Sequence, residues 1–191
     1  SIWGRDNAIK ETFDRDPMED GRMSFMEDDG SSLETVTLDD AVYLSGSNDY
    51  ISVTNVKQGI DVSKYQGDID WNAVRSAGYE FAFIRVGYRG YDAGTLTMDP
   101  YFDQNMRGAI NAGMKVGVYI FSQAINPTEA IEEADFVVEH VRDYNITMPL
   151  VLDYEFVGTG KGRLWNAQLS KTAATDICNT FCQRIESYGY T

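Results

Sequence analysis

Two acidic side chains that stand one residue apart, Asp153 and Glu155, offer the clearest chemistry in this sequence. They follow Pro149 and a run of three aliphatic residues, a pattern typical of a buried strand. Because side chains alternate between the two faces of a strand, both carboxyl groups are expected to point the same way. Like charges held close together raise the pKa of one member, so one acid can be protonated while the other is ionised. Hydrolysis of a glycosidic bond requires that combination, although two ordinary acids at a solvated strand end are the commoner meaning of an isolated Asp-x-Glu.

Four short apolar runs, each followed by a helical pattern, surround and include this pair. The predicted strands cover residues 59–63, 79–86, 115–121 and 148–156, and the predicted helices begin near 71, 100, 127 and 170. This alternation indicates parallel βα units of the α/β class, in which functional groups gather at the carboxyl ends of the strands. The chemically capable residues near those ends, which can share one inward face, are Asp61, Arg85, Tyr119, Phe121, Asp153 and Glu155.

Local capping signals predict where the helices begin and end. Asp70 predicts the N-cap of the first helix, and Gly78 predicts its C-terminal stop. Asp99 followed by Pro100 predicts the start of the second helix. Glu129, three residues after an asparagine, predicts a capping box at the start of the third.

Composition excludes several functional classes. The chain of 191 residues has a formal net charge of −14, which disfavours nucleic acid and anionic lipid as partners. It contains no apolar run long enough to span a membrane. His140 is the single histidine, so a histidine-based triad or zinc site is not expected, and we predict no metal and no cofactor. Cys178 and Cys182 lie four residues apart on the apolar stripe of the last helix, where we expect them to pack as thiols rather than form a disulfide.

Residues 1–58 differ from the rest of the chain. They hold 13 acidic against 5 basic residues and few aliphatic ones in the first half. Such segments bury little apolar surface, so we predict an acidic linker or small appendage, with β-like runs at 34–38, 41–44 and 50–56. The main domain is expected to span residues 59–191. No charged-then-apolar leader precedes it, so a signal peptide is either absent or already removed.

Residues 59–191 resemble the family 25 glycoside hydrolases, the N-acetylmuramidases also called Chalaropsis-type lysozymes. The motifs that carry the resemblance are Gly59-Ile60-Asp61-Val62-Ser63-Lys64-Tyr65-Gln66-Gly67 with Ile69-Asp70-Trp71, then Phe83-Ile84-Arg85-Val86-Gly87, Gly117-Val118-Tyr119-Ile120-Phe121 and Leu152-Asp153-Tyr154-Glu155. The first and last are specific in combination, whereas the middle two would be weak alone. Arg85 departs from the pattern, since many relatives carry lysine there.

The resemblance implies an irregular (β/α), TIM-like barrel of eight strands, of which four βα units, about the first half, are visible here. An open half-barrel would leave strand edges and an apolar face uncovered. We therefore expect a truncated chain, or a second chain or missing C-terminal segment that completes the barrel.

The resemblance also implies a reaction and its residues. The family cleaves the β-1,4 bond between N-acetylmuramic acid and N-acetylglucosamine in the peptidoglycan glycan strand, outside the cell or at the cell wall. Glu155 would be the general acid, and Asp153 and Asp61 would be the stabilising and orienting carboxylates. Retention of configuration is implied, with either an aspartate or the N-acetyl group of the sugar as nucleophile.

The remaining site residues are candidates for substrate binding. Tyr119, Phe121, Tyr65 and Tyr88 could serve as sugar platforms, with burial in the barrel an equal expectation for Phe121. Arg85 could hold a carboxylate of the groove or of the substrate, or form a structural ion pair instead.

Three other functions stay open at this point. The first is a non-catalytic peptidoglycan-binding domain on the same fold, which would not require all three acids. The second is an incomplete, inactive fragment. The third is a metal-dependent polysaccharide deacetylase, which is disfavoured because such sites usually place histidine beside aspartate.

Overall fold

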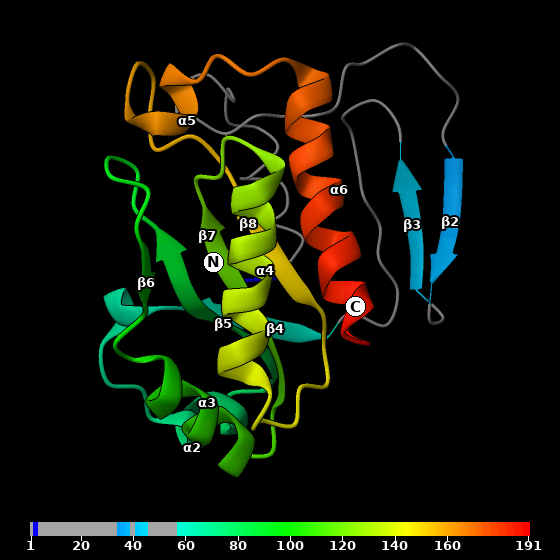
Figure 1. Ribbon diagram of the computed structural model, residues 1–191. Coiled ribbons are helices and arrows are strands. Elements are labelled where there is room, and N and C mark those ends of the chain that lie inside the picture. Colours follow the sequence, from blue (N-terminus) through cyan, green and yellow to red (C-terminus); the bar gives the residue numbers. More distant parts are fainter. Residues whose placement is uncertain (1, 4–33, 39–40, 46–56) are drawn as a thin grey trace.

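The computed structural model describes residues 2–3, 34–38, 41–45 and 57–191. The strands are β1 (Ile2–Trp3), β2 (Glu34–Leu38), β3 (Ala41–Ser45), β4 (Gln58–Val62), β5 (Tyr79–Arg89), β6 (Leu96–Met98), β7 (Lys115–Ser122) and β8 (Leu150–Tyr154). The helices are the 3₁₀ turn η1 (Lys64–Gln66), α2 (Trp71–Ser76), α3 (Phe102–Asn111), α4 (Pro127–Val141), α5 (Gly162–Asn166) and α6 (Lys171–Ser187). Each strand and helix predicted for residues 59–191 is present (Figure 1).

The main sheet has the order β1-β4-β5-β7-β8, and β6 pairs with β5. Strands β4, β5, β7 and β8 run parallel, as the alternation of strands and helices predicted. Consecutive parallel strands are adjacent in the sheet, so their carboxyl ends lie along one edge. Strand β8 ends at Tyr154, which leaves Glu155 just beyond the predicted strand rather than within it.

The two faces of the sheet differ in burial. Even-numbered residues of β5 and β7, such as Ile84, Val118 and Ile120, are fully buried beneath the helices. Odd-numbered neighbours on the other face, such as Phe83 and Tyr119, are only half-buried. This alternation is the period-2 pattern of a sheet with one face on the core, and it leaves the second face for the site.

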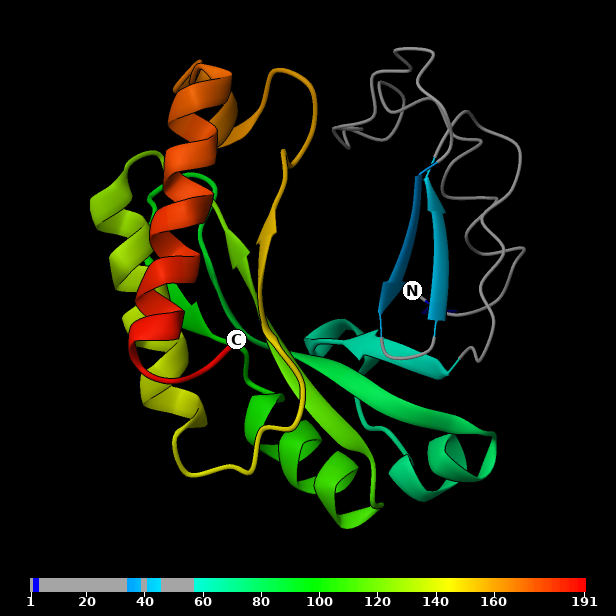
Figure 2. The same ribbon diagram turned by 90° about the vertical axis from the view of Figure 1, so that its right-hand side faces the viewer.

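Helices cover one face of the sheet. The core joins the even-numbered strand residues to the apolar faces of α3, α4 and α6. Helices α4 and α6 lie side by side in Figure 1, and the quarter-turned view in Figure 2 places both on the same side of β7 and β8. The apolar stripe of α4 recurs every three to four residues and faces the core, since its members are at most 1 % exposed: Ala130, Ala134, Val137 and Val141.

Two of the predicted caps are confirmed, one forms in part and one is wrong. The Asp70 carboxylate accepts a hydrogen bond from Ala73 N, and Gly78 takes a positive φ of 98° after α2. Asp99 does not cap α3, which begins at Phe102 without a side-chain cap. The box at the start of α4 forms only in part: Glu129 N donates to Asn126 Oδ1 at 3.0 Å, but the Glu129 carboxylate accepts from Ile125 N, one residue before the N-cap. Both acids are instead paired with arginines.

The segment 1–58 is described only in part. Strands β2 and β3 form a separate antiparallel hairpin where two of the β-like runs were predicted, and the run at 50–56 lies outside the described residues. The pair β1–β4 is antiparallel, so Ile2–Trp3 belongs to the main sheet.

Two further features concern the helices. Cys178 is half-buried, as predicted, but Cys182 is exposed because it lies at the margin of the stripe, and both thiols are free. No described helix combines the length and the apolar character needed to cross a membrane.

Candidate active site

The three predicted acids come together on the face of the sheet opposite α4 and α6. Asp61 lies near the end of β4, Asp153 near the end of β8, and Glu155 just after β8. All three line one cavity of about 650 Å³, together with Tyr119 and the apolar side chains of β5 and β8. Asp61 is level with Phe83 of β5 and Gly117 of β7, whereas Asp153 is level with Phe121, four residues further along β7, so the shared cavity and not the strand register shows that the acids lie together.

Tyr119 occupies the centre of this arrangement. Burial raises its pKa to about 12, with the carboxylates of Asp61 and Asp153 adding to the shift and the guanidinium of Arg85 opposing it. The phenol therefore stays protonated at neutral pH. It can donate a hydrogen bond to acids that come from the two outer strands of the parallel sheet, β4 and β8. Tyr119 lies in β7, where it pairs in register with Arg85 of β5 and with Val151 of β8.

A second cavity of about 500 Å³ adjoins the first and shares Tyr119, Asp153 and Glu155 with it. The other predicted binding residues, Phe121, Arg85, Tyr65 and Tyr88, line it as well. Tyr65 is 78 % exposed and Tyr91 is 51 % exposed, so both rings are accessible to a ligand. All eight predicted site residues therefore lie in two adjoining cavities on one face.

Arg85 forms a structural ion pair. Its guanidinium contacts the carboxylate of Asp99 through Nε at 2.8 Å and through Nη2 at 2.7 Å, and the Asp99 side chain is fully buried. Asp99 also accepts hydrogen bonds from the backbone N–H groups of Lys64 and Tyr101. The pair thus fixes one wall of the second cavity. Of the two roles expected for Arg85, the structure shows the structural ion pair.

With this geometry in place, the comparisons with known proteins identify the family. Residues 60–191 match glycosyl hydrolases family 25. The chain belongs to this family.

Three relatives illustrate the likeness to family 25. Lysozyme M1 from Streptomyces globisporus is 39 % identical over 111 residues, which are 56 % of this chain and 35 % of that protein. The bacterial lysozyme structure from Streptomyces coelicolor is 31 % identical, with a TM-score of 0.53 over 69 % of this chain and 58 % of that one. The modular autolysin LytC from Streptococcus pneumoniae, solved with a synthetic peptidoglycan ligand, is 19 % identical with a TM-score of 0.57, covering 82 % of this chain and 42 % of that one, and shares the fold. This chain therefore spans roughly a third to three fifths of the length of these relatives.

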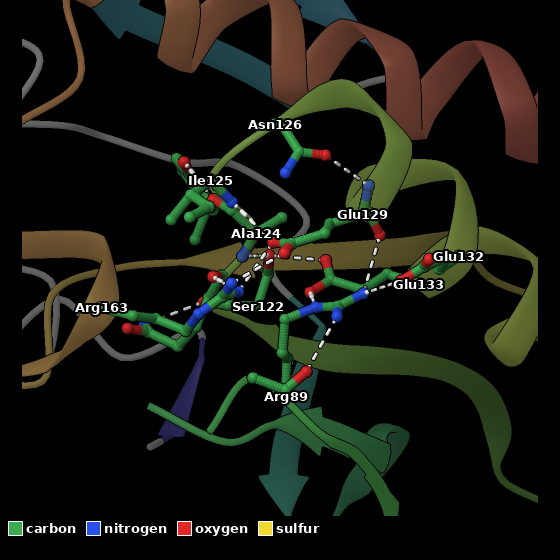
Figure 3. Close-up of polar contacts among 12 residues, drawn as sticks. Arg89, Ser122, Ala124, Ile125, Asn126, Glu129, Glu132, Glu133 and Arg163 are labelled. Atoms are coloured by element: carbon green, nitrogen blue, oxygen red, sulfur yellow. Dashed lines mark hydrogen bonds and ion pairs between the residues drawn. The ribbon is translucent and has the colours of Figure 1, made fainter. Parts of the chain in front are cut away.

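A polar network holds the loops at the carboxyl edge of the sheet of this family 25 domain (Figure 3). Arg163 contacts Glu129 through two hydrogen bonds of 2.7 Å and donates a third, of 2.8 Å, to the carbonyl of Gln123. Burial would raise the pKa of Glu129, but hydrogen bonds from Arg163 and from Ile125 N outweigh it and hold that pKa below its usual value. This contact joins the loop after β8 to the start of α4.

Arg89 forms the second half of the network. Its Nε lies 2.7 Å from the fully buried carboxylate of Glu133, which also accepts from Ser122 Oγ at 2.6 Å. Its other nitrogens donate to the Glu129 and Gly94 carbonyls. Buried charges are retained when they are paired and hydrogen-bonded in this way, and they tie β5 and β7 to α4.

Gln123 links this network to the general-acid candidate. Its fully buried side chain donates from Nε2 to the carbonyl of Glu155 at 2.7 Å and to that of Ser122 at 2.9 Å. Sequence reasoning missed Gln123, although its position one residue after β7 places it at the carboxyl edge of the sheet, where functional groups were expected. It also missed Asp99, because Asp-Pro is equally typical of a helix start.

The described part of the chain contains no group of three or more His, Cys, Asp or Glu side chains arranged to hold a metal ion.

Proposed function

We propose that this family 25 domain hydrolyses the β-1,4 bond between N-acetylmuramic acid and N-acetylglucosamine in peptidoglycan. The observation that carries the proposal is that one cavity is lined by Tyr119 and by three acids, Asp61, Asp153 and Glu155. These acids come from the two outer strands of the parallel sheet. Three acids at one face can supply both a proton and a negative charge, and glycosidic cleavage needs both.

In this mechanism Glu155 is the general acid. It lies just past β8, and its side chain is one methylene longer than that of aspartate, so it can reach the leaving glycosidic oxygen. Asp153 stays ionised and stabilises the positive charge that develops at the anomeric carbon. Asp61 orients water or the reacting sugar from the opposite side, and the Tyr119 phenol donates a hydrogen bond among these oxygens. Retention through an aspartate nucleophile and retention through the N-acetyl group of the sugar both fit these roles.

The comparisons support the substrate class. Two relatives carry the names "Lysozyme M1" and "Autolytic lysozyme", and the LytC autolysin was solved with a synthetic peptidoglycan ligand. The partner of this domain is accordingly a peptidoglycan glycan strand, and its place of action is outside the cell or at the cell wall. The apolar lining of the cavity beside β8, including Val151, which is 37 % exposed, suits closure of the sheet into the barrel by further strands.

Digestion of purified peptidoglycan tests the proposal. We expect the wild-type chain to release fragments whose new reducing-end sugar, identified by mass, is N-acetylmuramic acid. We expect Glu155→Gln to keep the far-ultraviolet circular dichroism of the wild type and to lose about a hundredfold or more in turnover. Glu186→Gln, an exposed change on α6, is the matched control and should retain full activity.

Three results would contradict the proposal. Wild-type turnover by Glu155→Gln would remove the general acid, and an N-acetylglucosamine reducing end would change the bond that is cleaved. Wall binding without any release of reducing ends would instead support a non-catalytic binding domain.

A further inference from the structure

Lys64 is held firmly at the entrance of the second cavity. It begins η1, and its backbone N–H donates to the buried carboxylate of Asp99 at 3.0 Å. The preceding residue, Ser63, forms a reciprocal capping box with Gln66. The backbone that carries the Lys64 side chain is therefore fixed on both sides, and the side chain is half-buried where it lines the cavity.

Two tyrosine rings hold the Lys64 ammonium in place. Nζ lies 5.3 Å from the ring centre of Tyr65 and 5.4 Å from that of Tyr88. Cζ of Arg85 lies 5.2 and 5.5 Å from the same two centres. Two cations thus share one pair of aromatic rings, which attract positive charge at these distances. The result is a compact positive corner in the cavity that Asp153 and Glu155 also line.

The charges of this corner are not balanced equally. Arg85 is neutralised by Asp99, and Arg89, which also lines the cavity, is neutralised by Glu133. Among the residues that the structure describes, no carboxylate lies within ion-pair distance of Lys64 Nζ. The ammonium of Lys64 is therefore the cation that the second cavity presents to a ligand.

We propose that Lys64, Tyr65 and Tyr88 form an anion subsite that binds a carboxylate on the lactyl-peptide branch of the muramic acid residue. The identity of the ligand rests on the proposed function. The sugar rings of the glycan strand are neutral, so its negative groups are the carboxylates of that branch. A cavity lined by Asp153 and Glu155 in a chain of net charge −14 repels such groups. A fixed cation beside the acids offsets this repulsion where the branch leaves the strand.

Binding measured apart from hydrolysis tests the subsite. In a Glu155→Gln background, the full chain is titrated onto insoluble peptidoglycan freed of phosphate polymers, and the bound fraction is measured by sedimentation. We expect Lys64→Met to weaken binding about threefold to fivefold, which is typical of one partly exposed ion pair. Lys64→Arg should retain most of the affinity. Lys115→Met, an exposed charge at the opposite end of β7, is the matched control and should change nothing.

Three wall preparations identify the anion. On walls whose carboxyl groups are capped as amides, the Glu155→Gln protein and its Lys64→Met variant should bind equally. An amidase cleaves the lactyl–peptide amide and so creates a lactyl carboxylate that peptide-bearing residues lack; the released strands are soluble and are tested attached to beads, where a difference between the two proteins shows that a lactyl carboxylate can occupy the subsite. A difference confined to intact walls assigns it to the peptide.

Two results separate this inference from the proposed function. An equal loss for Lys64→Met on capped and uncapped walls, or no loss on any wall, would overturn the anion subsite. Failure of the wild-type chain to release reducing ends would overturn the muramidase proposal, while a charge-dependent effect of Lys64 on binding would still stand.

Discussion

The position of the Glu155 carboxyl group depends on contacts made by its backbone. Glu155 follows the last residue of β8, so the strand hydrogen bonds of the sheet no longer hold it. The bond from Gln123 Nε2 to its carbonyl replaces them, and Tyr154 OH donates to the Ala124 carbonyl at 2.8 Å in the same loop. Both contacts attach the end of β8 to the segment that follows β7. We therefore infer that Gln123 is a positioning residue for the proposed general acid.

Replacing Gln123 by methionine keeps the size of the side chain and removes its donor. We expect kcat on peptidoglycan to fall by about tenfold to a hundredfold, because small displacements of a catalytic group are costly. KM should change little, since Gln123 is fully buried behind the cavity. Initial rates over a range of substrate concentrations measure the two effects separately.

Gln104→Met is the control, because the Gln104 amide makes its hydrogen bond to exposed Asp68, away from the cavity. It should leave both constants unchanged. A change in KM alone for Gln123→Met would mean that Gln123 acts on substrate binding and not on Glu155.

How far the site could be predicted differs from residue to residue. Asp61, Asp153 and Tyr119 were predictable, because strand parity and the end of a strand are read directly from sequence spacing. Asp99 was not, because its partner Arg85 lies 14 residues away and meets it only through the tertiary fold. Its local signal, an aspartate before a proline, indicated a helix cap that the structure does not form.

The loops at the carboxyl edge of the sheet are held by ion pairs between elements. Arg163, in α5, reaches Glu129 in the first turn of α4, and its own backbone N–H donates to the Tyr91 carbonyl at 2.7 Å. Three connections are thereby joined: the one after β5, the one after β7 and the one after β8. These are the connections that carry Tyr91, Gln123 and Glu155.

Glu129→Gln tests this junction. We expect the free energy of unfolding at pH 7 to fall by about 1.5–3 kcal/mol, because the change removes a charged hydrogen-bond acceptor from two donors. The difference from the wild type should be fully present above the ordinary pKa of glutamate. Since hydrogen bonds from Arg163 and Ile125 N lower the folded-state pKa of Glu129, the difference should be lost as the pH falls from the ordinary range of glutamate through that lowered value. Melting curves of both proteins from pH 3 to pH 7 measure this convergence.

Glu139→Gln, an exposed change on the same helix, should follow the wild type at every pH. A constant gap between Glu129→Gln and the wild type across the whole range would show that the loss does not come from the charge of Glu129.

At Gly117 the backbone of β7 packs closely against a side chain of β5 and against the backbone just before β8. A Cβ placed at Gly117 would lie 2.5 Å from the Phe83 ring and 2.7 Å from the Pro149 carbonyl, which belongs to the backbone and cannot move aside cheaply. We expect Gly117→Ala to lower the free energy of unfolding by about 1–3 kcal/mol through overpacking. Urea denaturation measures this change. A neutral outcome would mean that Phe83 and β8 shift freely.

Elements with strong local signals were predictable, and those formed by distant contacts were not. Helices α4 and α6 combine a capping residue with an apolar stripe, and both start within one residue of the prediction. Strand β6 and helix α5 lie in glycine-rich segments that read as loops. They exist because β6 pairs with the end of β5, and because the start of α5 is anchored by the Tyr91 carbonyl. Neither partner can be recognised from the local sequence.

The whole molecule combines a large negative charge with an acidic site and a proposed anionic substrate. The net charge is −14, and the cations of the second cavity other than Lys64 are internally neutralised. Long-range repulsion and short-range attraction to Lys64 therefore oppose each other when a glycan strand approaches. Salt screens the long-range repulsion at lower concentrations than the short-range attraction, because the screening length falls from about 30 Å at 0.01 M to about 8 Å at 0.15 M and about 3 Å at 1 M.

This difference predicts a maximum in wall binding with salt. In the Glu155→Gln background, binding should tighten as sodium chloride rises from about 0.01 M to about 0.15 M, because repulsion between the acidic chain and the wall is screened first. It should weaken again toward about 1 M, where the contact between Lys64 and its carboxylate is screened as well. The Lys64→Met variant should show the rise without the later fall, and walls with capped carboxyl groups should show neither. A steady loss of binding from the lowest salt in both proteins would mean that attraction by cations elsewhere on the chain governs the approach, and that its net charge does not.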